Sequence, residues 1–375
     1  MRKLNILQLI NVRWYNACAY YAVSLSYALH KRGHKVIVAG DPHSPPILKA
    51  KELGLLVYED LYLSYIIPWR IIYNVKRMVD LVEAERIDII NAHRGEGHLI
   101  AALSKRFFKR QVPIVRTRGD VRPPRLNLFN HYLNDKLTDK IITTCQVLKE
   151  SYINVLKMSQ DKVINIPVGI DHEIFSPKES NRISEDRLNI PEGNLVVGIL
   201  GRLSPVKGHR YFVQAAEYVL KQIPHTIFII CGHDAQISVE DLKDMVEKMG
   251  MKDNFRFVGK VENPREIISL FDVGVVSSVG SETICRVALE YMSMGKPVVG
   301  TKVNAIPEVV EHEVNGLLVE PGNAQELAGA LIELLQDEQK RKNYGEASRQ
   351  MVLEKFTLDV FAQKTEEVYF SVLSQ

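Results

Sequence analysis

Short apolar runs alternate with longer helix-like stretches along almost the whole chain, and this alternation limits the fold more than any other feature. Between the apolar runs, apolar residues recur at the spacing of one helix face. The alternation favours the α/β class, with a parallel sheet covered by helices on both faces. In the first half, strands are expected at residues 4–10, 35–40, 55–60, 87–93, 113–117, 140–144 and 162–167, and helices at 19–32, 69–85, 97–108, 127–136 and 146–157.

A second series of the same kind follows a polar segment, residues 169–192, that holds Pro177 and Pro191 and has the composition of a linker. Since 375 residues suffice for two cores, we expect two βα domains at 1–170 and 171–355. A last helix, within 356–375, is expected to cross back onto the first domain. The second series has expected strands at 195–201, 225–232, 255–260, 272–278, 297–301 and 316–320, and expected helices at 209–222, 239–249, 264–271, 324–336 and 338–354.

The composition is that of an ordinary globular protein, with 46% apolar and 25% charged residues. Its four cysteines lie far apart without a CxxC pair, which predicts reduced thiols and no zinc site. The apolar run at residues 4–10 is short and interrupted by Asn5 and Gln8, so we interpret it as a strand rather than a signal peptide. These features predict a cytoplasmic protein.

The charge is divided unevenly between the two halves. Residues 1–170 hold 26 Lys and Arg against 14 Asp and Glu, a net charge of +12, whereas the remainder of the chain carries −9. A basic half indicates an anionic partner such as a membrane surface, a phosphorylated lipid, an acidic glycan or nucleic acid, or else an ordinary solvated face.

Residues 277–300, SSVGSETICRVALEYMSMGKPVVG, carry two carboxylates with seven residues between them. Glu282 is expected in a loop after a strand, and Glu290 on the helix that follows. Ser281 or Thr283 could cap the start of this helix, and Gly295 suits the left-handed residue after its end.

A helix that begins just beyond the carboxyl end of a strand directs unpaired N–H groups and its positive dipole end toward the ligand side, where an anion can bind. Carboxylates beside such a site are better suited to accepting hydroxyl hydrogen bonds than to binding phosphate. The stretch therefore indicates a ligand with both phosphates and hydroxyls, such as a sugar nucleotide.

A second motif, GRLSPVKG at residues 201–208, directly follows the first strand of the second domain. Arg202 offers a planar fork for phosphate oxygens and Lys207 a mobile point charge, while Gly201 and Gly208 allow close approach of the backbone. Taken alone, the motif could be a surface turn with two solvated cations. Together with the two glutamates it predicts a phosphate-binding edge.

The chain resembles the retaining glycosyltransferases of family 4. The resemblance rests on GRLSPVKG, on Glu282 to Glu290 followed by YMSMGKPVV, on IPVGIDHEIFSP (166–177) and on NGLLVEPG (315–322). It covers essentially the whole second domain and is looser over residues 1–160. It implies the GT-B fold, in which two Rossmann-like βα domains face a cleft and a C-terminal helix crosses back to the first domain.

The resemblance also implies the activity: transfer of a sugar from a nucleoside diphosphate sugar to a hydroxyl of a glycan or lipid-linked acceptor, in lipopolysaccharide or surface polysaccharide synthesis. UDP or GDP is the expected nucleoside diphosphate, and neither a metal nor another cofactor is expected. Catalysis would rest on positioning and electrostatics, with retention of anomeric configuration by front-side attack.

The matching positions take their roles from the family. Arg202 and Lys207 would bind the donor diphosphate, Glu282 hydroxyls of the transferred sugar, and Glu290 the ribose. His93, at the end of a first-domain strand, would face the donor sugar. The remaining implied binding positions are Gly201, the amides of Thr283, Ile284 and Cys285, and the base-lining segment from Gly259 to Val261.

Three departures from the family pattern stand out. The glycine pair after the first strand is replaced by NVRWYN (11–16), which leaves acceptor binding there open. The glycine shortly after Glu282 is missing from the TICR loop (283–286), where Arg286 could add a cation near the donor. His233 follows Gly232 where a second glycine is usual.

The basic first domain suggests a peripheral enzyme at the inner face of the plasma membrane. The segment WRIIY (69–73) with Lys76 and Arg77 could lie on an anionic bilayer, and so could a cluster of eight cations. The alternative is that these residues form an ordinary packed helix and a solvated loop. Nucleic acid is not expected, because no recognised binding motif accompanies the charge. The cluster consists of Lys105, Arg106, Lys109, Arg110, Arg116, Arg118, Arg122 and Arg125.

Other functions on the same fold stay open. A sugar-nucleotide epimerase would act on the donor alone, and a phosphorylase would usually need pyridoxal phosphate. A non-catalytic sugar-nucleotide-binding subunit would be favoured by loss of Arg202, Lys207 or Glu290, and all three are present. An NAD-dependent enzyme is disfavoured because no GxGxxG follows an early strand.

Overall fold

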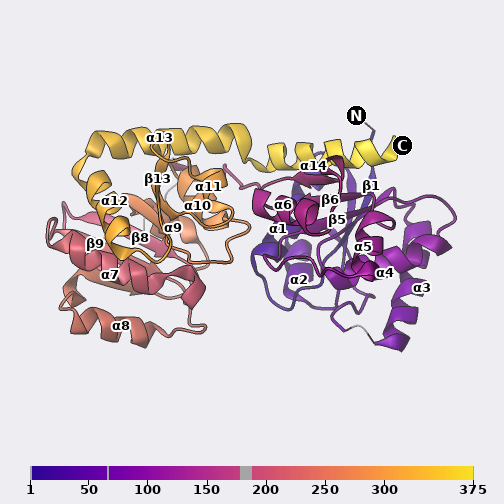
Figure 1. Cartoon of the computed structure of the whole chain (residues 1–375), viewed down its shortest axis with the longest axis horizontal. Helices are drawn as coiled ribbons and strands as arrows, with labels where there is room; N and C mark the ends of the chain where they lie inside the picture. The colour runs from indigo at the N-terminus through magenta and orange to yellow at the C-terminus, as the bar shows by residue number, and fades with distance from the viewer. Residues whose placement is uncertain (1, 66, 178–187, 375) are drawn as a thin grey trace. The chain divides into compact units, whose positions relative to one another are not determined.

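The computed structural model describes residues 2–65, 67–177 and 188–374 and contains two compact units (Figure 1). Unit 1 comprises Met1–Gly169 and Leu358–Gln375, and unit 2 comprises Ile170–Thr357. Part of the predicted linker, residues 178–187, lies outside the described residues.

Unit 1 is built on a seven-stranded sheet in the order β3-β2-β1-β4-β5-β6-β7, with every neighbouring pair parallel. The strands are near-continuous apolar runs, as expected where helices cover both faces of a parallel sheet. They are β1 (Asn5–Leu9), β2 (Lys35–Ala39), β3 (Leu56–Tyr58), β4 (Ile89–Ala92), β5 (Ile114–Arg118), β6 (Lys140–Thr143) and β7 (Val163–Asn165).

Side chains of unit 1 form separate cores on the two faces of this sheet. On one face, Leu7, Leu9 and Ile90 pack with Met78 and Val82 of α3. On the other face, Val38 packs with residues of α1 and α2. The helices are α1 (Ala17–Lys31), α2 (Pro45–Glu52), α3 (Pro68–Ala84), α4 (Gly95–Ser104), η1 (Lys105–Phe107), α5 (Leu128–Asp135), α6 (Gln146–Asn154), η2 (Gln160–Lys162) and α14 (Leu358–Leu373).

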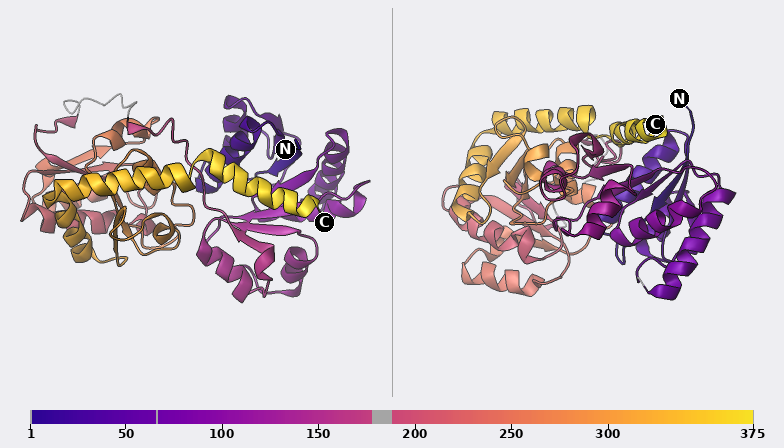
Figure 2. Two further views of the ribbon diagram at one scale, coloured as in Figure 1. Left: turned by 90° about the horizontal axis from the view of Figure 1, so that it is seen from above. Right: turned by 45° about the vertical axis from the view of Figure 1, so that its right-hand side comes forward.

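The last helix, α14, belongs to unit 1 and packs against α1 (Figure 2). Its Glu366 accepts hydrogen bonds from Arg32 at 2.7 and 2.8 Å, and one of its oxygens lies 2.7 Å from Nε2 of His34. Its Tyr369 hydroxyl accepts hydrogen bonds from the side-chain amides of Gln8 (3.2 Å) and Asn91 (2.8 Å), in β1 and β4. The expected return of the C-terminal helix to the first domain is confirmed.

Unit 2 contains a six-stranded parallel sheet in the order β10-β9-β8-β11-β12-β13. Phe212 of α7 packs edge-on against Phe228 of β9 in a core that also includes Leu331 and Leu334 of α12. The strands are β8 (Leu195–Leu200), β9 (Thr226–Cys231), β10 (Phe255–Val258), β11 (Val273–Val276), β12 (Val298–Thr301) and β13 (Gly316–Val319). The helices are η5 (Pro205–Lys207), α7 (His209–Leu220), α8 (Val239–Lys248), η6 (Lys252–Asn254), α9 (Pro264–Ser269), α10 (Arg286–Ser293), α11 (Ile306–Val309), α12 (Ala324–Gln336) and α13 (Glu338–Lys355).

The α/β class with two Rossmann-like sheets is therefore confirmed, and most expected strands and helices occur with slightly shorter bounds. Two helices were not predicted. The helix α2 begins with Pro45-Pro46, which suggests a loop although proline fits the first helical turn, and α11 is only four residues long.

The four cysteines carry free thiols, as expected. In the described residues, no helix combines the length and the apolar composition that crossing a bilayer requires.

Each sheet has one point where the strand order reverses: between β1 and β4 in unit 1, and between β8 and β11 in unit 2. The loops that leave two such neighbouring strands diverge, which opens a crevice at their carboxyl ends where ligands of this fold class bind. The loops after β8 and β11 carry both motifs found in the sequence.

Candidate functional site

Two loops of unit 2, residues 201–208 after β8 and residues 277–285 after β11, are held together by close backbone contacts. The Cβ of any residue larger than glycine at position 208 would lie 1.9 Å from the Ser277 carbonyl oxygen, and Gly208 has a φ of +73°. Ser277 Oγ donates to the carbonyl oxygens of Lys207 and Gly208 at 3.2 Å each, and the Val279 amide donates to the Val206 carbonyl at 2.8 Å. The last glycine of GRLSPVKG therefore allows the two loops to approach.

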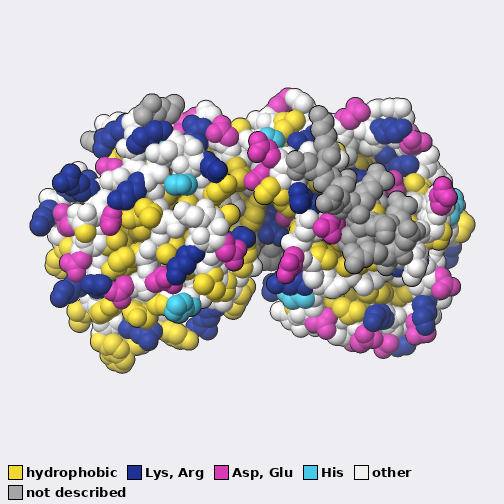
Figure 3. Space-filling model, turned by 180° about the vertical axis from the view of Figure 1, so that it is seen from behind, with side chains coloured by type: hydrophobic (Ala, Val, Ile, Leu, Met, Phe, Trp, Pro, Cys, Tyr) yellow, Lys and Arg dark blue, Asp and Glu magenta, His cyan; other side chains and the backbone are white. Residues whose placement is uncertain are grey.

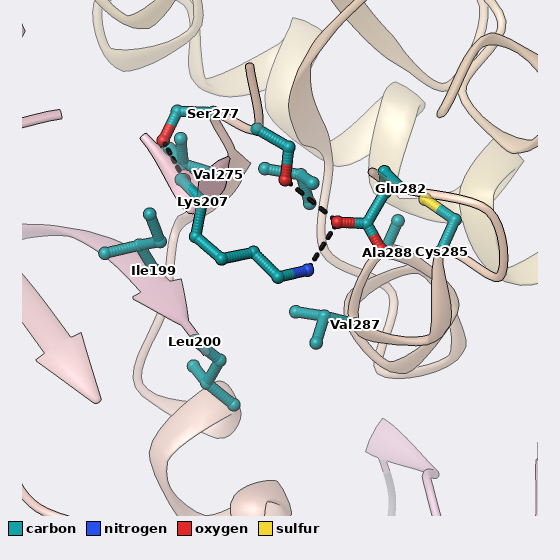
Figure 4. A pocket seen from close by; sticks show the side chains of 11 residues that line it. Ile199, Leu200, Lys207, Val275, Ser277, Glu282, Cys285, Val287 and Ala288 are labelled. Carbon is teal, nitrogen blue, oxygen red and sulfur yellow. Dashed lines mark hydrogen bonds and ion pairs between the residues drawn. The ribbon is translucent and has the colours of Figure 1, made fainter. Parts of the chain in front are cut away.

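This contact brings Lys207 to Glu282 (Figure 4). Lys207 Nζ lies 2.5 Å from Glu282 Oε2, and the Ser278 hydroxyl donates to the same oxygen at 2.8 Å. The Glu282 backbone is also fixed, because its carbonyl accepts from the Ala305 amide at 2.9 Å. Glu282 is buried and Lys207 is partly exposed, so the ion pair closes a small cavity of about 10 Å³.

Glu290 lies on α10, as predicted. Its side chain is almost fully buried, one oxygen lies 3.0 Å from Nε of Arg286, and the other has no hydrogen-bond partner in the described chain. Burial raises the pKa of the Glu290 carboxyl, and the charge of Arg286 opposes this shift. A buried carboxylate oxygen without a partner is energetically costly, and a ligand hydroxyl would satisfy it.

Glu290 also lies near the end of β9. Burial, and then the charge of Glu290, raise the pKa of the Cys231 thiol to about 11. The Cys231 thiol donates to the Gly259 carbonyl at 3.5 Å. A Cβ at Gly259 would meet no other atom within 4 Å, so there is open space beside this residue. Cys231 therefore interacts both with the segment predicted to line a base and with the glutamate predicted to bind a ribose.

The start of α10 differs from the prediction. Neither Ser281 nor Thr283 caps it: the helix begins at Arg286, and Cys285 is the N-cap residue without a side-chain cap hydrogen bond. Cys285 has a φ of +50°, a left-handed conformation that favours glycine, and Ser281 has a φ of +54°. The chain thus forms a strained loop where the related pattern has a glycine. Gly295 has a φ of +68° after the end of the helix, as predicted.

Of the other predicted positions, Gly201 and Arg202 begin the loop after β8. Gly201 donates its amide to the Cys231 carbonyl at 2.9 Å, whereas the Arg202 side chain is exposed and forms no ion pair within the described chain. Thr283 and Ile284 are buried beside Cys285, and Val261 is partly exposed. The cavity beside Lys207 is lined by Glu282 and Cys285 but not by Arg202 or Glu290.

The predicted residue of unit 1, His93, directly follows β4 at the point where the strand order reverses. Its Nε2 lies 2.7 Å from the Gln8 side-chain oxygen, and Gln8 in turn donates to Tyr369 of α14. Burial, and then the charge of Arg116, lower the pKa of His93 to about 3, so its ring is neutral near pH 7. His93 lines a cavity of about 650 Å³ that lies entirely within unit 1.

The eight clustered cations of the first domain do not form one surface. Four line the cavity that contains His93, two line a separate apolar groove, and Arg110 donates to the Ile87 carbonyl at 2.6 Å. The four in the cavity are Arg116, Arg118, Arg122 and Arg125; Lys105 and Arg106 line the groove.

Sequence reasoning missed three kinds of contact at these sites. The serine pair Ser277-Ser278 clamps the loops and contacts Glu282, and only its place at the end of a strand could have indicated this role. Arg286, which the sequence offers as a cation near the donor, pairs with Glu290 in the i,i+4 arrangement, and this contact was not predicted. Gln8, inside an apolar strand, was treated only as an interruption, although it orients His93.

Across residues 2–65, 67–177 and 188–374, no three His, Cys, Asp or Glu side chains are grouped so that they could hold a metal ion. The cations at the unit 2 site, Lys207 and Arg202, provide the positive charge there.

Comparison with protein families finds two matches that together cover most of the chain. Residues 19–174 match the model "Glycosyltransferase Family 4", and residues 180–351 match "Glycosyl transferases group 1". Among similar proteins, N-acetyl-alpha-D-glucosaminyl L-malate synthase of Bacillus anthracis is 25% identical over 304 residues, covering 79% of this chain and 78% of that protein.

A second relative, UDP-Gal:alpha-D-GlcNAc-diphosphoundecaprenol alpha-1,3-galactosyltransferase of Escherichia coli, is 25% identical over 281 residues, which is 71% of this chain and 72% of the relative. Among solved structures, Anabaena Alr3699/HepE in complex with UDP superposes with a TM-score of 0.84 at 21% identity, covering 98% of this chain and 100% of that one. The fold is that of GT-B glycosyltransferases.

Proposed function

We propose that this chain moves a sugar from a nucleoside diphosphate sugar to an acceptor hydroxyl, with retention of anomeric configuration and without a metal. The proposal starts from the family, because the two halves of the chain match the family 4 and group 1 models of glycosyltransferases. The acceptor is a hydroxyl of a glycan or of a lipid-linked glycan, in the synthesis of lipopolysaccharide or another surface polysaccharide. The Escherichia coli relative, whose name specifies a diphosphoundecaprenol acceptor, supports this choice.

The observation that carries the proposal is the Lys207–Glu282 pair in the crevice between the loops after β8 and β11. Such a crevice is where sheets of this class bind nucleotides. Lys207 and the exposed Arg202 would bind the diphosphate, while Glu282 accepts hydroxyls of the sugar. Glu290, one of whose oxygens has no partner in the described chain, would accept the ribose hydroxyls. The Anabaena structure with UDP supports UDP as the first nucleotide to test, followed by GDP.

In the proposed reaction, the bond between the anomeric carbon and the diphosphate oxygen breaks, and the acceptor oxygen bonds to the same face of that carbon. The acceptor proton passes to the departing phosphate oxygen. Lys207 and Arg202 stabilise the charge that develops on the leaving diphosphate, so the protein contributes electrostatics and positioning rather than a covalent intermediate.

In this proposal, His93 does not act as a general acid or base. Since its ring is neutral and held by Gln8, it offers a fixed hydrogen-bonding nitrogen toward the sugar. Its contribution is positioning, and no step requires it to take up a proton.

The first test is a thermal-shift screen against UDP, GDP, ADP and CMP, and against their common sugar conjugates. A ligand at 100 times its Kd adds about 2.7 kcal/mol of stability, which is readily measured. A shift with one nucleoside diphosphate is expected. If no nucleotide shifts the transition, the assignment of the unit 2 site is wrong.

Transfer is then assayed with the identified donor and a panel of lipid-linked and free glycans, with and without excess EDTA. Activity is expected to persist in EDTA; complete loss that Mg²⁺ or Mn²⁺ restores would disprove a metal-free mechanism. Conversion of the donor sugar in the absence of any acceptor would instead identify an epimerase.

We also propose that unit 1 contacts anionic membranes, because exposed Trp69 and Ile72 of α3 lie among cations. The protein should sediment with anionic vesicles at low salt and be released at high salt. Equal sedimentation with neutral vesicles, or none with either, would contradict this.

A further inference from the structure

Unit 1 contains two adjoining cavities of opposite character. The first is the basic pocket of about 650 Å³ beside His93, and the second is an apolar groove of about 920 Å³. Both are lined by α4 and α5: Gly95 and Glu96 at the start of α4 face the pocket, and Ala102 and Leu103 near its end face the groove. Phe129 of α5 lines both cavities, so they adjoin at this side chain.

The basic pocket holds more positive charge than its own carboxylates neutralise. Five arginines line it, against Glu96 and Asp120. Asp120 is already engaged, because Arg122 donates to it at 2.6 Å and Arg94 lies 3.9 Å away. The five arginines are Arg94, Arg116, Arg118, Arg122 and Arg125.

The other arginines have no carboxylate within ion-pair distance in the described chain. Within the described chain, Arg116, Arg118 and Arg125 form no ion pair, although Arg116 is almost fully buried. Arg116 donates only to the Ala92 carbonyl at 2.8 Å, and Arg118 to the Arg122 carbonyl at 2.5 Å, with its Nε buried and unpartnered. Burying guanidinium groups without an anion is unfavourable, and an anionic ligand would offset that cost.

The start of α4 adds to this potential. Its N-cap residue, Arg94, makes no side-chain cap hydrogen bond, and Gly95 has open space beside it. The N–H groups and positive dipole end of this ten-residue helix therefore face the same pocket as the arginines. Together they suit phosphate oxygens better than a neutral sugar.

The groove is lined mainly by apolar side chains that the cores of unit 1 do not use. Ile72, Val75 and Val79 form a second stripe on α3, turned away from the buried Met78. Phe107 lies opposite and is more than half exposed. Figure 3 shows hydrophobic side chains gathered over α3, with Lys and Arg beside them. A surface of this size and composition calls for an apolar occupant.

We propose that the two cavities form one acceptor site, in which the arginine pocket binds the phosphate or diphosphate of a lipid-linked acceptor and the groove holds the first part of its hydrocarbon chain. An anionic group directly attached to a long apolar chain matches both cavities and their junction at Phe129. This inference rests on the proposed function, since it names the class of acceptor for that transfer.

The test measures binding of three matched probes to the full chain by calorimetry, below their micelle concentrations. Farnesyl diphosphate carries both parts, farnesol only the chain, and inorganic pyrophosphate only the charge. All titrations use a background with both Arg202→Ala and Lys207→Ala, so that diphosphate binding in unit 2 does not contribute. Farnesyl diphosphate should bind at least tenfold more tightly than either fragment.

Substitutions separate the two parts of the site. Arg118→Gln with Arg125→Gln should weaken farnesyl diphosphate and pyrophosphate at least tenfold and leave farnesol unchanged. Ile72→Ser with Phe107→Ser should weaken farnesyl diphosphate and farnesol and leave pyrophosphate unchanged. Matched controls are Arg210→Gln, an exposed arginine of unit 2, and Leu48→Ser, an exposed leucine of α2. Neither control should alter binding of any probe.

Several outcomes would overturn the proposal. Farnesyl diphosphate binding no tighter than its fragments would show that the cavities do not act together. Arginine variants that bind pyrophosphate normally would remove the phosphate assignment. If the Ile72/Phe107 variant binds farnesyl diphosphate normally but loses anionic vesicles, the groove is a membrane-docking face only.

Misfolding is checked by near-ultraviolet circular dichroism, and the single variants Arg125→Gln and Ile72→Ser, both at exposed positions, replace any double variant that fails. Nucleotide binding is measured in parallel with the wild-type chain. Its failure would count against the proposed donor site, whereas the probe titrations report on unit 1 alone.

Discussion

Lys207 Nζ lies 2.5 Å from Glu282 Oε2, although the two residues are 75 positions apart in the sequence. Each charge therefore neutralises the other in the unliganded chain, in a position where solvent access is limited. A bound diphosphate would give Lys207 a new anionic partner and free Glu282 to accept sugar hydroxyls. Donor binding would therefore replace the Lys207–Glu282 contact with two contacts to the donor, one from each residue.

The first prediction follows from this exchange. Lys207→Ala and Glu282→Ala should each lower the transfer rate at least ~100-fold, the usual effect of removing one group that stabilises developing charge. Both proteins should keep a cooperative thermal transition, because Lys207 is partly exposed and neither residue belongs to a hydrophobic core.

The matched control is Lys302→Ala, which breaks an exposed ion pair with Glu320 in the same unit. It should transfer sugar at the wild-type rate, since exposed pairs contribute little. Turnover near the wild-type rate in Lys207→Ala or Glu282→Ala would show that these residues are not part of the reaction site.

Glu290 should distinguish nucleotides by their ribose hydroxyls. We expect the wild-type chain to bind its preferred nucleoside diphosphate about tenfold or more tightly than the 2′-deoxy form, because hydrogen bonds to charged groups contribute about 1.5–3 kcal/mol. In Glu290→Ala this preference should disappear, as measured by titration of both nucleotides. An undiminished preference would assign the ribose to another group.

The burial of Glu290 also predicts how the stability of the chain and its ribose preference change with pH. Since burial raises the pKa of Glu290, its protonated form persists to a higher pH than in the unfolded chain. The stability gained from that form is present below the unfolded pKa and is lost as pH rises through the folded value. The ribose preference should run the other way and weaken as pH falls, and Glu290→Gln should make it independent of pH.

His209 predicts an acid-sensitive step in folding stability. Both of its ring nitrogens are buried without a partner in the described residues, and burial, then the charge of Lys207, lower its pKa to about 4. In the unfolded chain His209 binds a proton below about pH 6.5, whereas in the folded chain it stays neutral down to about pH 4. The free energy of unfolding should therefore fall by up to about 3 kcal/mol as the pH is lowered from about 6.5 to about 4.

His209→Leu should therefore be as stable as the wild type at pH 7 or more so, and its advantage should grow at pH 5. Urea denaturation at the two pH values measures the difference. An advantage that is the same at both would mean that His209 does not titrate as its burial implies.

Tyr369 of α14 should stabilise unit 1 through its hydroxyl. In Tyr369→Phe the buried amides of Gln8 and Asn91 lose their shared acceptor, which should cost about 1–3 kcal/mol of unfolding free energy. Tyr218→Phe, which removes a hydroxyl that accepts only a long, exposed hydrogen bond from Gln325 at 3.4 Å, should cost far less. A loss in Tyr369→Phe no larger than in this control would show that the amides find other partners.

Much of the fold could be predicted because its elements carry strong local signals. The apolar runs of β1 and β9 and the glycine after α10 act through periodicity and backbone conformation, which depend on near neighbours. The placement of Glu282 in a loop and Glu290 on a helix followed in the same way.

The rest depended on contacts between distant segments. No local pattern indicates that Ser277 reaches the Lys207 carbonyl, or that Arg116 and Arg118 lie in one cavity while Arg106 lies in another. The expected cap of α10 failed because the loop adopts a left-handed conformation at Cys285, a residue that rarely favours it. Arrangement in three dimensions decided these features.

The position of α14 bears on the order in which the chain can fold during synthesis. A ribosome releases the seven strands of unit 1 first, but Gln8, His34 and Asn91 complete their hydrogen bonds only when Glu366 and Tyr369 emerge, after all of unit 2. Until α14 is synthesised, the face of α1 that it covers stays exposed, while unit 2 forms its own core. Nascent unit 1 is therefore expected to be the stage most exposed to aggregation and most dependent on chaperones.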